Sequence, residues 1–202
     1  MCSEALNSAR RSADSTDVGS PLRILVVCTA NICRSPAAEA YLRSHAEERG
    51  IDIEVSSSGF LWNGEGPSEV MAAVMAERGF DLSAHESRIS TCEMIDDADL
   101  VVTMERHHGR NLGVKCNPRG IFTLKGAVAV LGAVDASITD PMERLAAAEE
   151  ARQHGDLLGD GPDEVDDPHG RSARVNRKTA DELRDLTSEL LNVLFPTVEN
   201  PS

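Results

Sequence analysis

The sequence predicts a single α/β domain in which a four-stranded, parallel, doubly wound sheet is flanked by helices. Two observations predict this fold class. Short apolar runs alternate with helical stretches between Leu22 and Leu194, and strands that alternate with helices pair in parallel through right-handed crossovers. The first apolar run is also uninterrupted, which is typical of a strand covered on both faces. Ligands of such sheets bind beyond the carboxyl ends of the strands, so chemistry is expected in the loop after the first strand.

The first strand is predicted over Leu22–Val27 and ends at Cys28. A helix follows the next loop, because Ser35 can serve as its N-cap, Pro36 suits the first helical position and Gly50 can close it. The same alternation continues along the chain. The next expected elements are a strand at 51–56, a helix ending near 79, a strand at 100–102, a short helix from 105 to about 112 and a strand at 120–124.

The final third is less regular. A helix led by Asp140 and Pro141 fades near Gly155, an acidic loop covers 156–167, and an amphipathic helix of about five turns closes the fold at Leu194. The domain is therefore expected to span 21–196, with 126–166 as an extended segment for which no role can be derived. Residues 1–20 are predicted to be a flexible N-terminal tail because they lack apolar periodicity, and 197–202 a C-terminal tail.

The charge balance restricts the partners. With 20 Lys+Arg against 34 Asp+Glu, the chain carries a formal net charge of -14 at pH 7. A global negative field repels phosphodiesters and lipid phosphates, so neither a nucleic acid nor a membrane is expected as a partner, and an anionic substrate must be captured by local donors. No apolar run approaches the roughly 18 to 20 residues of a membrane span, and residues 1–20 lack a secretory signal. The expected compartment is the cytoplasm; the oligomeric state is not predicted.

The cysteines are expected to be free thiols and not members of disulfides. The chain has five of them, and they are odd in number and widely scattered in a chain too long to need a disulfide framework. The spacing is also poor for zinc, since the only close pair, Cys28 and Cys33, has four residues between its members and no second pair to match. No metal ion is expected.

The segment from Cys28 to Ser35, CTANICRS, carries the chemistry. A loop between a buried strand and a helix start wraps its backbone N–H groups around a small volume at the positive end of the helix dipole, which makes an anion site. Those donors and the nearby Arg34 favour the thiolate of Cys28, which is then a good nucleophile. The planar fork of Arg34 can hold two oxygens of a tetrahedral anion, and Ser35 can donate a hydrogen bond to the sulfur.

A second feature complements this loop. Hydrolysis of a phosphomonoester needs an acid that protonates the leaving oxygen, and Asp167, restricted by Pro168 in the acidic loop, offers one. Asn31 also suits the loop, because asparagine tolerates positive φ better than other residues with a side chain. His107 and His108 fall on a predicted surface helix and receive no role.

At this point the sequence resembles the low-molecular-weight protein tyrosine phosphatase family from about Leu22 to Leu194. The resemblance is carried by ordered blocks at compatible spacing, which are far more specific together than any one alone. The matching blocks are Val27–Ala40, Ser57–Gly59, Leu82–Arg88, Ala98–Glu105 and Asp167–Pro168.

The resemblance implies the roles of the site residues. Cys28 would be the nucleophile that forms a phosphocysteine, Arg34 the phosphate clamp and Asp167 the general acid. No cofactor is implied, because the loop and the guanidinium supply the positive field, and the partner would be a phosphorylated protein substrate. The residues implied for the phosphate-binding loop and its supporting network are Thr29, Ala30, Asn31, Ile32, Cys33, Ser35, Ser57 and His85.

The substrate preference is less firmly indicated. Family members that act on phosphotyrosine commonly carry aromatic residues just after the Asp-Pro pair, whereas this chain has His169 and Gly170 there. Phe60, Trp62 and His169 are the candidates for a wall along the substrate. Ile32 resembles the tyrosine-directed members, while relatives directed at phosphoarginine tend to have threonine at that place. Phosphotyrosine is therefore the expected substrate, and phosphoarginine the alternative.

Two further alternatives remain from the residues. A thiol-dependent arsenate reductase on this fold would need a disulfide relay; Cys92 and Cys116 are available, but they are not paired on one mobile loop. A module that binds phosphoproteins without turnover would need no acid such as Asp167. Within the loop, Cys33 has two interpretations: it packs there, or it forms a reversible disulfide that shields Cys28 from overoxidation, as in relatives.

Overall fold

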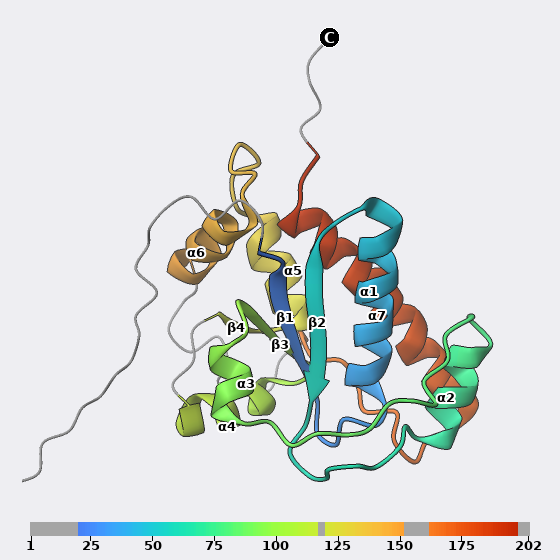
Figure 1. The fold of residues 1–202 in the computed structure, drawn as a ribbon. Helices are drawn as coiled ribbons and strands as arrows, with labels where there is room; N and C mark the ends of the chain where they lie inside the picture. The colour runs from blue at the N-terminus through green and yellow to red at the C-terminus, as the bar shows by residue number, and fades with distance from the viewer. Residues whose placement is uncertain (1–19, 117–119, 152–161, 198–202) are drawn as a thin grey trace, which may run out of the picture.

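The fold is a parallel sheet between two layers of helices. The computed structural model describes residues 20–116, 120–151 and 162–197 (Figure 1). Its strands run in the order β2-β1-β3-β4, and every neighbouring pair is parallel. The predicted fold class is confirmed. The strands are β1 (Leu22–Val27), β2 (Ile53–Ser58), β3 (Leu100–Thr103) and β4 (Ile121–Thr123).

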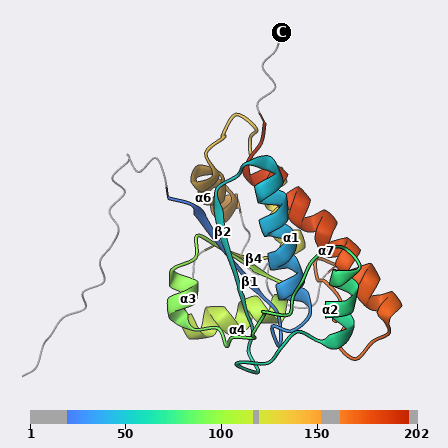
Figure 2. The same cartoon turned by 45° about the vertical axis from the view of Figure 1, so that its right-hand side comes forward.

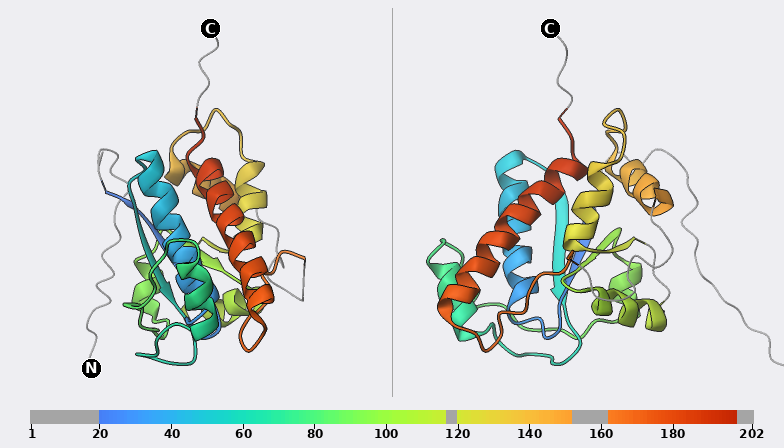
Figure 3. Two further views of the ribbon diagram at one scale, coloured as in Figure 1. Left: turned by 90° about the vertical axis from the view of Figure 1, so that its right-hand side faces the viewer. Right: turned by 180° about the vertical axis from the view of Figure 1, so that it is seen from behind.

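The helices are divided unequally between the two faces of the sheet (Figures 1 and 2). One layer consists of α1 (Arg34–Arg49), α2 (Glu69–Ala76), α5 (Leu124–Gly132) and α7 (Ala173–Leu194), and α1 and α7 lie side by side in it (Figure 3). The shorter helices α3 (Cys92–Asp96) and α4 (Arg106–Cys116) cover the other face. Helix α6 (Pro141–Ala151) packs beside α5. No described helix is long and apolar enough to cross a membrane.

The central strand β1 explains why its sequence is apolar without interruption. Ile24 and Val26 belong to the larger core beneath α1 and α7, whereas Leu25 and Val27 belong to a smaller core beneath α3 and α4. Successive side chains of a strand point to opposite faces, so both sets are buried by different helices. The strand ends at Val27, so Cys28 follows directly at the carboxyl edge of the sheet, where it belongs to the larger core.

Several predicted boundaries are corrected. Helix α1 begins at Arg34 with Cys33 at the N-cap position and no side-chain cap, so Ser35 is not the N-cap. The fourth strand ends at Thr123, because the Thr123 hydroxyl accepts a hydrogen bond from the N–H of Gly126 (3.0 Å) and so caps α5. The helix expected from 105 to about 112 continues to Cys116. Helix α5 itself was not anticipated.

The described part of the segment 126–166 packs against the rest of the domain and helps to hold its helices together. It contains α6, which begins after Asp140 as predicted, and the Asp140 carboxylate accepts the N–H of Glu143 (2.9 Å). The buried guanidinium of Arg144 donates to four backbone carbonyls and so joins α6 to the end of α5 and to α7. Residues 152–155 at the end of the expected helix and 156–161 of the expected acidic loop lie outside the described residues, as do 1–19 and 198–202 of the expected tails.

The expectation that all five cysteines are thiols is wrong. Cys92 and Cys116 form a disulfide with a Cα–Cα distance of 5.2 Å. It joins the first residue of α3 to the last residue of α4, which are separated by 24 positions in the sequence. Sequence spacing did not indicate the pair. Strand β3 separates α3 from α4 in the sequence, and the two helices contact each other only in the folded chain. Cys28 and Cys33 are free and buried.

The disulfide should stabilise the folded chain. Closing a loop of this length removes denatured-state entropy worth about 3 kcal/mol. We therefore expect the double variant Cys92→Ser/Cys116→Ser to lose about 3 kcal/mol in the free energy of unfolding, measured by chemical denaturation without reductant. Wild-type protein kept reduced should unfold like the variant. Titration of every cysteine as a free thiol in oxidised, denatured protein would contradict the pairing.

Candidate active site

A small pocket opens at the carboxyl edge of the sheet, between the β1–α1 loop and the chain that precedes α7. Its volume is about 60 Å³. It brings together most residues that the sequence singled out, although they come from three separate parts of the chain. The lining residues are Cys28, Thr29, Ala30, Ile32, Cys33, Arg34, Leu61, Trp62, Asp167 and His169.

The sulfur of Cys28 is buried and surrounded by donors. The residue is 2% exposed. The backbone N–H of Asn31 donates to Sγ at 3.3 Å, and the Ser35 hydroxyl lies 3.0 Å from the same atom. The first turn of α1 begins at Arg34, so the positive end of that helix also faces the loop. These contacts favour a negative charge on the sulfur and near it.

Asn31 holds the loop in shape. Its φ is 56°, and it is the only non-glycine residue with positive φ among those described, as the sequence predicted for this position. Its side-chain amide donates to the hydroxyls of Ser35 (2.9 Å) and Ser57 (2.8 Å), and its Oδ1 accepts the N–H of Arg88 (2.8 Å). The His85 ring nitrogen Nε2 lies 2.7 Å from the Asn31 carbonyl oxygen. The predicted network residues are thus brought together, and Arg88 is an additional member.

Gly59 lets the β2 end approach the loop. A Cβ at this position would lie 2.8 Å from the Asn31 nitrogen and 2.9 Å from the carbonyl carbon of Ala30, which is closer than side-chain carbons pack. The neighbouring residue, Phe60, donates its N–H to the carbonyl of Thr29 (2.8 Å). This close approach explains why the Ser57–Gly59 block ends in a glycine, because a larger side chain would clash with the loop.

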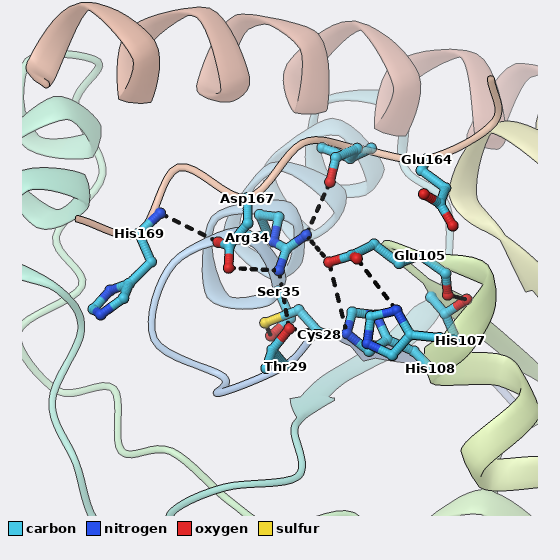
Figure 4. A network of polar contacts seen from close by, with 12 residues as sticks. Cys28, Thr29, Arg34, Ser35, Glu105, His107, His108, Glu164, Asp167 and His169 are labelled. Carbon is cyan, nitrogen blue, oxygen red and sulfur yellow. Dashed lines mark hydrogen bonds and ion pairs between the residues drawn. The ribbon is translucent and has the colours of Figure 1, made fainter. Parts of the chain in front are cut away.

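The guanidinium of Arg34 is held on several sides (Figure 4). The residue is 1% exposed. Its Nη1 donates to the carbonyl of Val165 (2.9 Å) and pairs with the carboxylate of Glu105. Its Nη2 donates to the Thr29 hydroxyl (3.1 Å) and lies 3.2 Å from Oδ2 of Asp167. Its Nε, although buried, has no hydrogen-bond partner in the described part of the chain.

Asp167 lies over the pocket on the segment that returns before α7. The N–H of Val165 donates to the carbonyl of Met104 (2.8 Å), which fixes this segment to the end of β3. The N–H of His169 donates to Oδ1 of Asp167 at 3.2 Å, while Oδ2 faces Arg34. The Asp167 side chain remains 46% exposed. A carboxyl group thus faces both solvent and the pocket, opposite the cysteine loop.

Cys33 differs from Cys28. Its thiol donates to the Ser68 hydroxyl (3.1 Å), and burial raises its pKa from 9.0 to about 11. At neutral pH the group therefore stays a thiol, which is a poor attacking group in disulfide formation. A protective Cys28–Cys33 disulfide remains a proposal, and its formation should become faster as the pH rises toward 11.

The proposed substrate wall is only partly brought together. Trp62 and His169 line the pocket, and Leu61, which the sequence analysis did not name, lies beside them. Trp62 is 42% exposed and Leu61 49% exposed. Phe60 does not line the pocket; it stacks on the His108 ring with 5.5 Å between ring centroids and packs against the smaller core. The expectation for Phe60 is therefore not met.

The placement of His108 on a surface helix is also wrong. His108 is 0% exposed, and its Nε2 lies 3.0 Å from the Thr29 hydroxyl oxygen. Burial, reinforced by electrostatic interaction with the neighbouring His107 and Arg34, lowers its pKa from 6.5 to about 3. Glu105 was also missed as a partner of Arg34. The available signal was its place directly after β3, where the carboxyl edge of the sheet gathers functional groups.

Glu105, His107 and His108 bring three metal-ligating groups within 4.8 Å of one another. Each already has another role: Glu105 pairs with Arg34 and His107, and His108 contacts Thr29. A dication at this point would lie beside the Arg34 guanidinium, and like charges at that range repel strongly. The cluster is better explained as support for the arginine than as a metal centre.

Comparison with known proteins agrees with this geometry. The family model described as low molecular weight phosphotyrosine protein phosphatase matches residues 23–199. The chain belongs to this family. The matched range includes the cysteine loop, nearly all of the sheet and the segment that carries Asp167.

Individual relatives of this low molecular weight phosphatase carry two kinds of name. A protein-arginine-phosphatase of Bacillus subtilis is 30% identical over 174 residues, which are 85% of this chain and 95% of the relative. A probable low molecular weight protein-tyrosine-phosphatase, AmsI of Erwinia amylovora, is 33% identical over 131 residues, or 63% and 85% of the two chains. A crystal structure of the tyrosine phosphatase from T. tengcongensis superposes with a TM-score of 0.66 at 30% identity, covering 85% of this chain and 98% of that one.

Proposed function

We propose that this protein is a phosphatase of phosphorylated proteins, directed at phosphotyrosine, in which Cys28 is the nucleophile, Arg34 the phosphate clamp and Asp167 the general acid. The observation that carries the proposal is the convergence of these three groups on one pocket: the Asp167 carboxylate lies 3.2 Å from the guanidinium that closes the cysteine loop. Membership of the low molecular weight phosphatase family supports it.

The polar groups of the pocket support an anionic ligand. The Nε of Arg34 is a buried cationic donor without a partner among the described residues, and leaving such a donor unsatisfied costs free energy. A phosphoryl oxygen in the pocket would accept from it and recover that cost. The chain as a whole is strongly acidic, so the capture of an anion depends on this local cluster of donors.

The first chemical step transfers the phosphoryl group to the enzyme. The Cys28 thiolate attacks phosphorus in line, so that an S–P bond forms while the P–O bond to the leaving group breaks. The proton of the Asp167 carboxyl goes to the departing oxygen. Backbone N–H groups of the loop and the Arg34 guanidinium stabilise the charge on the equatorial oxygens.

The second step releases phosphate. A water molecule attacks phosphorus, its proton goes to the Asp167 carboxylate, and the S–P bond breaks to restore the Cys28 thiolate. The hydroxyl of Ser35, 3.0 Å from the sulfur, stabilises this thiolate as a leaving group. Both steps use the same residues, so the half-exposed position of Asp167 suits a group that exchanges protons with water.

The pocket lining favours an aryl phosphate. Leu61 and Trp62 offer partly exposed apolar surface beside the cysteine loop, and Ile32 adds to it. Within the described part of the chain, Asp167 is the only acidic residue that lines the pocket, and the mechanism already uses it. Phosphoarginine is the second candidate because the B. subtilis relative with that name aligns with most of this chain.

An arsenate reductase is less well supported. Cys92 and Cys116 are bonded to each other on the α3–α4 face. Of the cysteines that the structure describes, only Cys33 lines the pocket together with Cys28. A turnover panel decides between the three activities: phosphotyrosine, phosphoserine and phosphoarginine peptides, and arsenate with thioredoxin, each with Cys28→Ser as control. We expect phosphotyrosine to be hydrolysed fastest. Release of phosphate from none of the peptides would overturn the proposal.

Replacing Asp167 with asparagine should slow the first step. We expect kcat on phosphotyrosine peptides to fall on the order of 100-fold, because the leaving oxygen departs without a proton. The loss should be smaller on p-nitrophenyl phosphate, whose leaving group is the weaker base. The measurement is kcat on both substrates. Asp166→Asn, at the neighbouring position outside the pocket lining, is the matched control, and equal losses in the two variants would contradict the assignment.

A further inference from the structure

The Thr29 hydroxyl contacts two groups of the site, the Arg34 guanidinium and the His108 ring (Figure 4). Its oxygen accepts a hydrogen bond from Nη2 of Arg34 at 3.1 Å and lies 3.0 Å from Nε2 of His108. Thr29 also lines the pocket with Cys28. A hydroxyl group has two acceptor lone pairs and one proton, so the direction of its proton depends on which ring nitrogen of His108 carries hydrogen.

The surroundings of His108 favour hydrogen on Nε2. This nitrogen lies 3.8 Å from Oε1 of Glu105, and a carboxylate attracts an N–H but repels a lone pair. The other nitrogen, Nδ1, is buried without a hydrogen-bond partner in the described residues, and an orphaned N–H is rarer in proteins than an orphaned acceptor. The ring is neutral near pH 7, because burial lowers its pKa to about 3.

With hydrogen on Nε2, both lone pairs of the Thr29 oxygen are occupied. Arg34 fills one and His108 fills the other, so the hydroxyl proton is turned away from both donors. The remaining direction is the pocket side of the loop, where Thr29 and Cys28 are neighbours. There the proton can be donated to an oxygen of a bound phosphoryl group.

We propose that His108 is a positioning residue that, together with Arg34, turns the Thr29 hydroxyl proton into the anion pocket, where Thr29 donates to the phosphoryl group. The inference rests on the proposed phosphatase function. The groups that face His108 agree with it: Glu105 and His107 come from the same helix region, Arg34 from the α1 start, and the Phe60 ring stacks against it from the β2 side. Phe60 thus keeps the imidazole plane in place.

A double-mutant cycle tests the proposal. Thr29→Val removes the hydroxyl, and His108→Leu removes the ring nitrogen. Each should reduce kcat/KM on p-nitrophenyl phosphate about 10-fold, the range of one hydrogen bond to a charged group. Because His108 acts through the hydroxyl, the double variant should lose no more than Thr29→Val alone. Losses that multiply, or an unchanged kcat/KM in Thr29→Val, would overturn the proposal.

Two conservative variants separate positioning from a merely structural role. Thr29→Ser keeps the hydroxyl, and His108→Gln places an amide N–H close to the position of Nε2; both should recover most of the activity. Thermal unfolding of each variant shows whether the fold is retained. His108→Gln that is as stable as wild type but as slow as His108→Leu would count against the proposal.

Binding of inorganic phosphate, measured by calorimetry, gives a readout independent of turnover. Thr29→Val and His108→Leu should each bind phosphate more weakly than wild type. The double variant should bind it no more weakly than Thr29→Val alone. If wild-type protein binds phosphate but hydrolyses no phosphoester, the proposed function fails while the cycle still decides the role of His108. If wild type turns over substrate and the cycle is additive, only the role of His108 fails.

Discussion

Replacing Cys28 with serine should abolish turnover while the protein still binds phosphate. The serine oxygen is protonated at neutral pH and is a far weaker nucleophile than a thiolate, so hydrolysis of p-nitrophenyl phosphate should fall on the order of 10⁴-fold or more. Phosphate affinity should change little, because Arg34 and the loop N–H groups remain. Steady-state rates and calorimetry measure the two effects.

The control for this variant is the double substitution Cys92→Ser/Cys116→Ser, which removes two sulfurs that do not line the pocket. It should hydrolyse the substrate at close to the wild-type rate below its unfolding temperature. Near wild-type turnover by Cys28→Ser would refute the nucleophile, and the phosphocysteine with it.

Replacing Arg34 with lysine should reduce kcat/KM on the order of 1,000-fold, although the charge is kept. A lysine ammonium is a point charge on a flexible stem, whereas the guanidinium of Arg34 binds Glu105, the Val165 carbonyl and the Thr29 hydroxyl at once. The variant loses both the planar fork for the phosphoryl oxygens and the fixed position of the positive charge. Rates on p-nitrophenyl phosphate measure the loss.

The same exchange on the same helix provides the comparison. Arg43→Lys alters an arginine whose side chain is 61% exposed, pairs with Glu39 and donates to the Val55 carbonyl, and which does not line the pocket. We expect its kcat/KM to stay close to wild type. If Arg34→Lys matched Arg43→Lys in rate, the clamp would have to be another residue.

Much of the fold could be predicted because apolar runs in a parallel sheet are local signals. The β1 run could be recognised because its residues pack alternately into two cores and are therefore all apolar except Arg23. The boundary between β4 and α5 was missed because Thr123 caps the helix between Phe122 and Leu124, and apolar residues this close together do not show by periodicity where the strand ends and the helix begins. The Cys92–Cys116 disulfide depends on the meeting of α3 and α4, which no spacing rule anticipates.

The site was predictable where one loop carries it and less so where tertiary packing does. The network around Asn31 follows from its block, whereas the burial of His108 depends on how α4 lies against the loop. Phe60 was expected in the pocket wall and Leu61 lines the pocket instead, because a loop sequence does not tell which of its apolar side chains turns inward. The polar sequence around His108 predicted an exposed side chain, whereas the structure buries it completely.

The contacts of Arg34 also concern the time at which the protein can become active. Its guanidinium is held by groups at 29, 105, 165 and 167, which leave a translating ribosome at very different moments. A nascent chain that has emerged only through α4 would already expose Cys28, but it would still lack the carbonyl of Val165 and the carboxyl of Asp167. Synthesis of the last third thus sets the earliest point of competence, and a chain released before it would carry a reactive sulfur without a working enzyme around it.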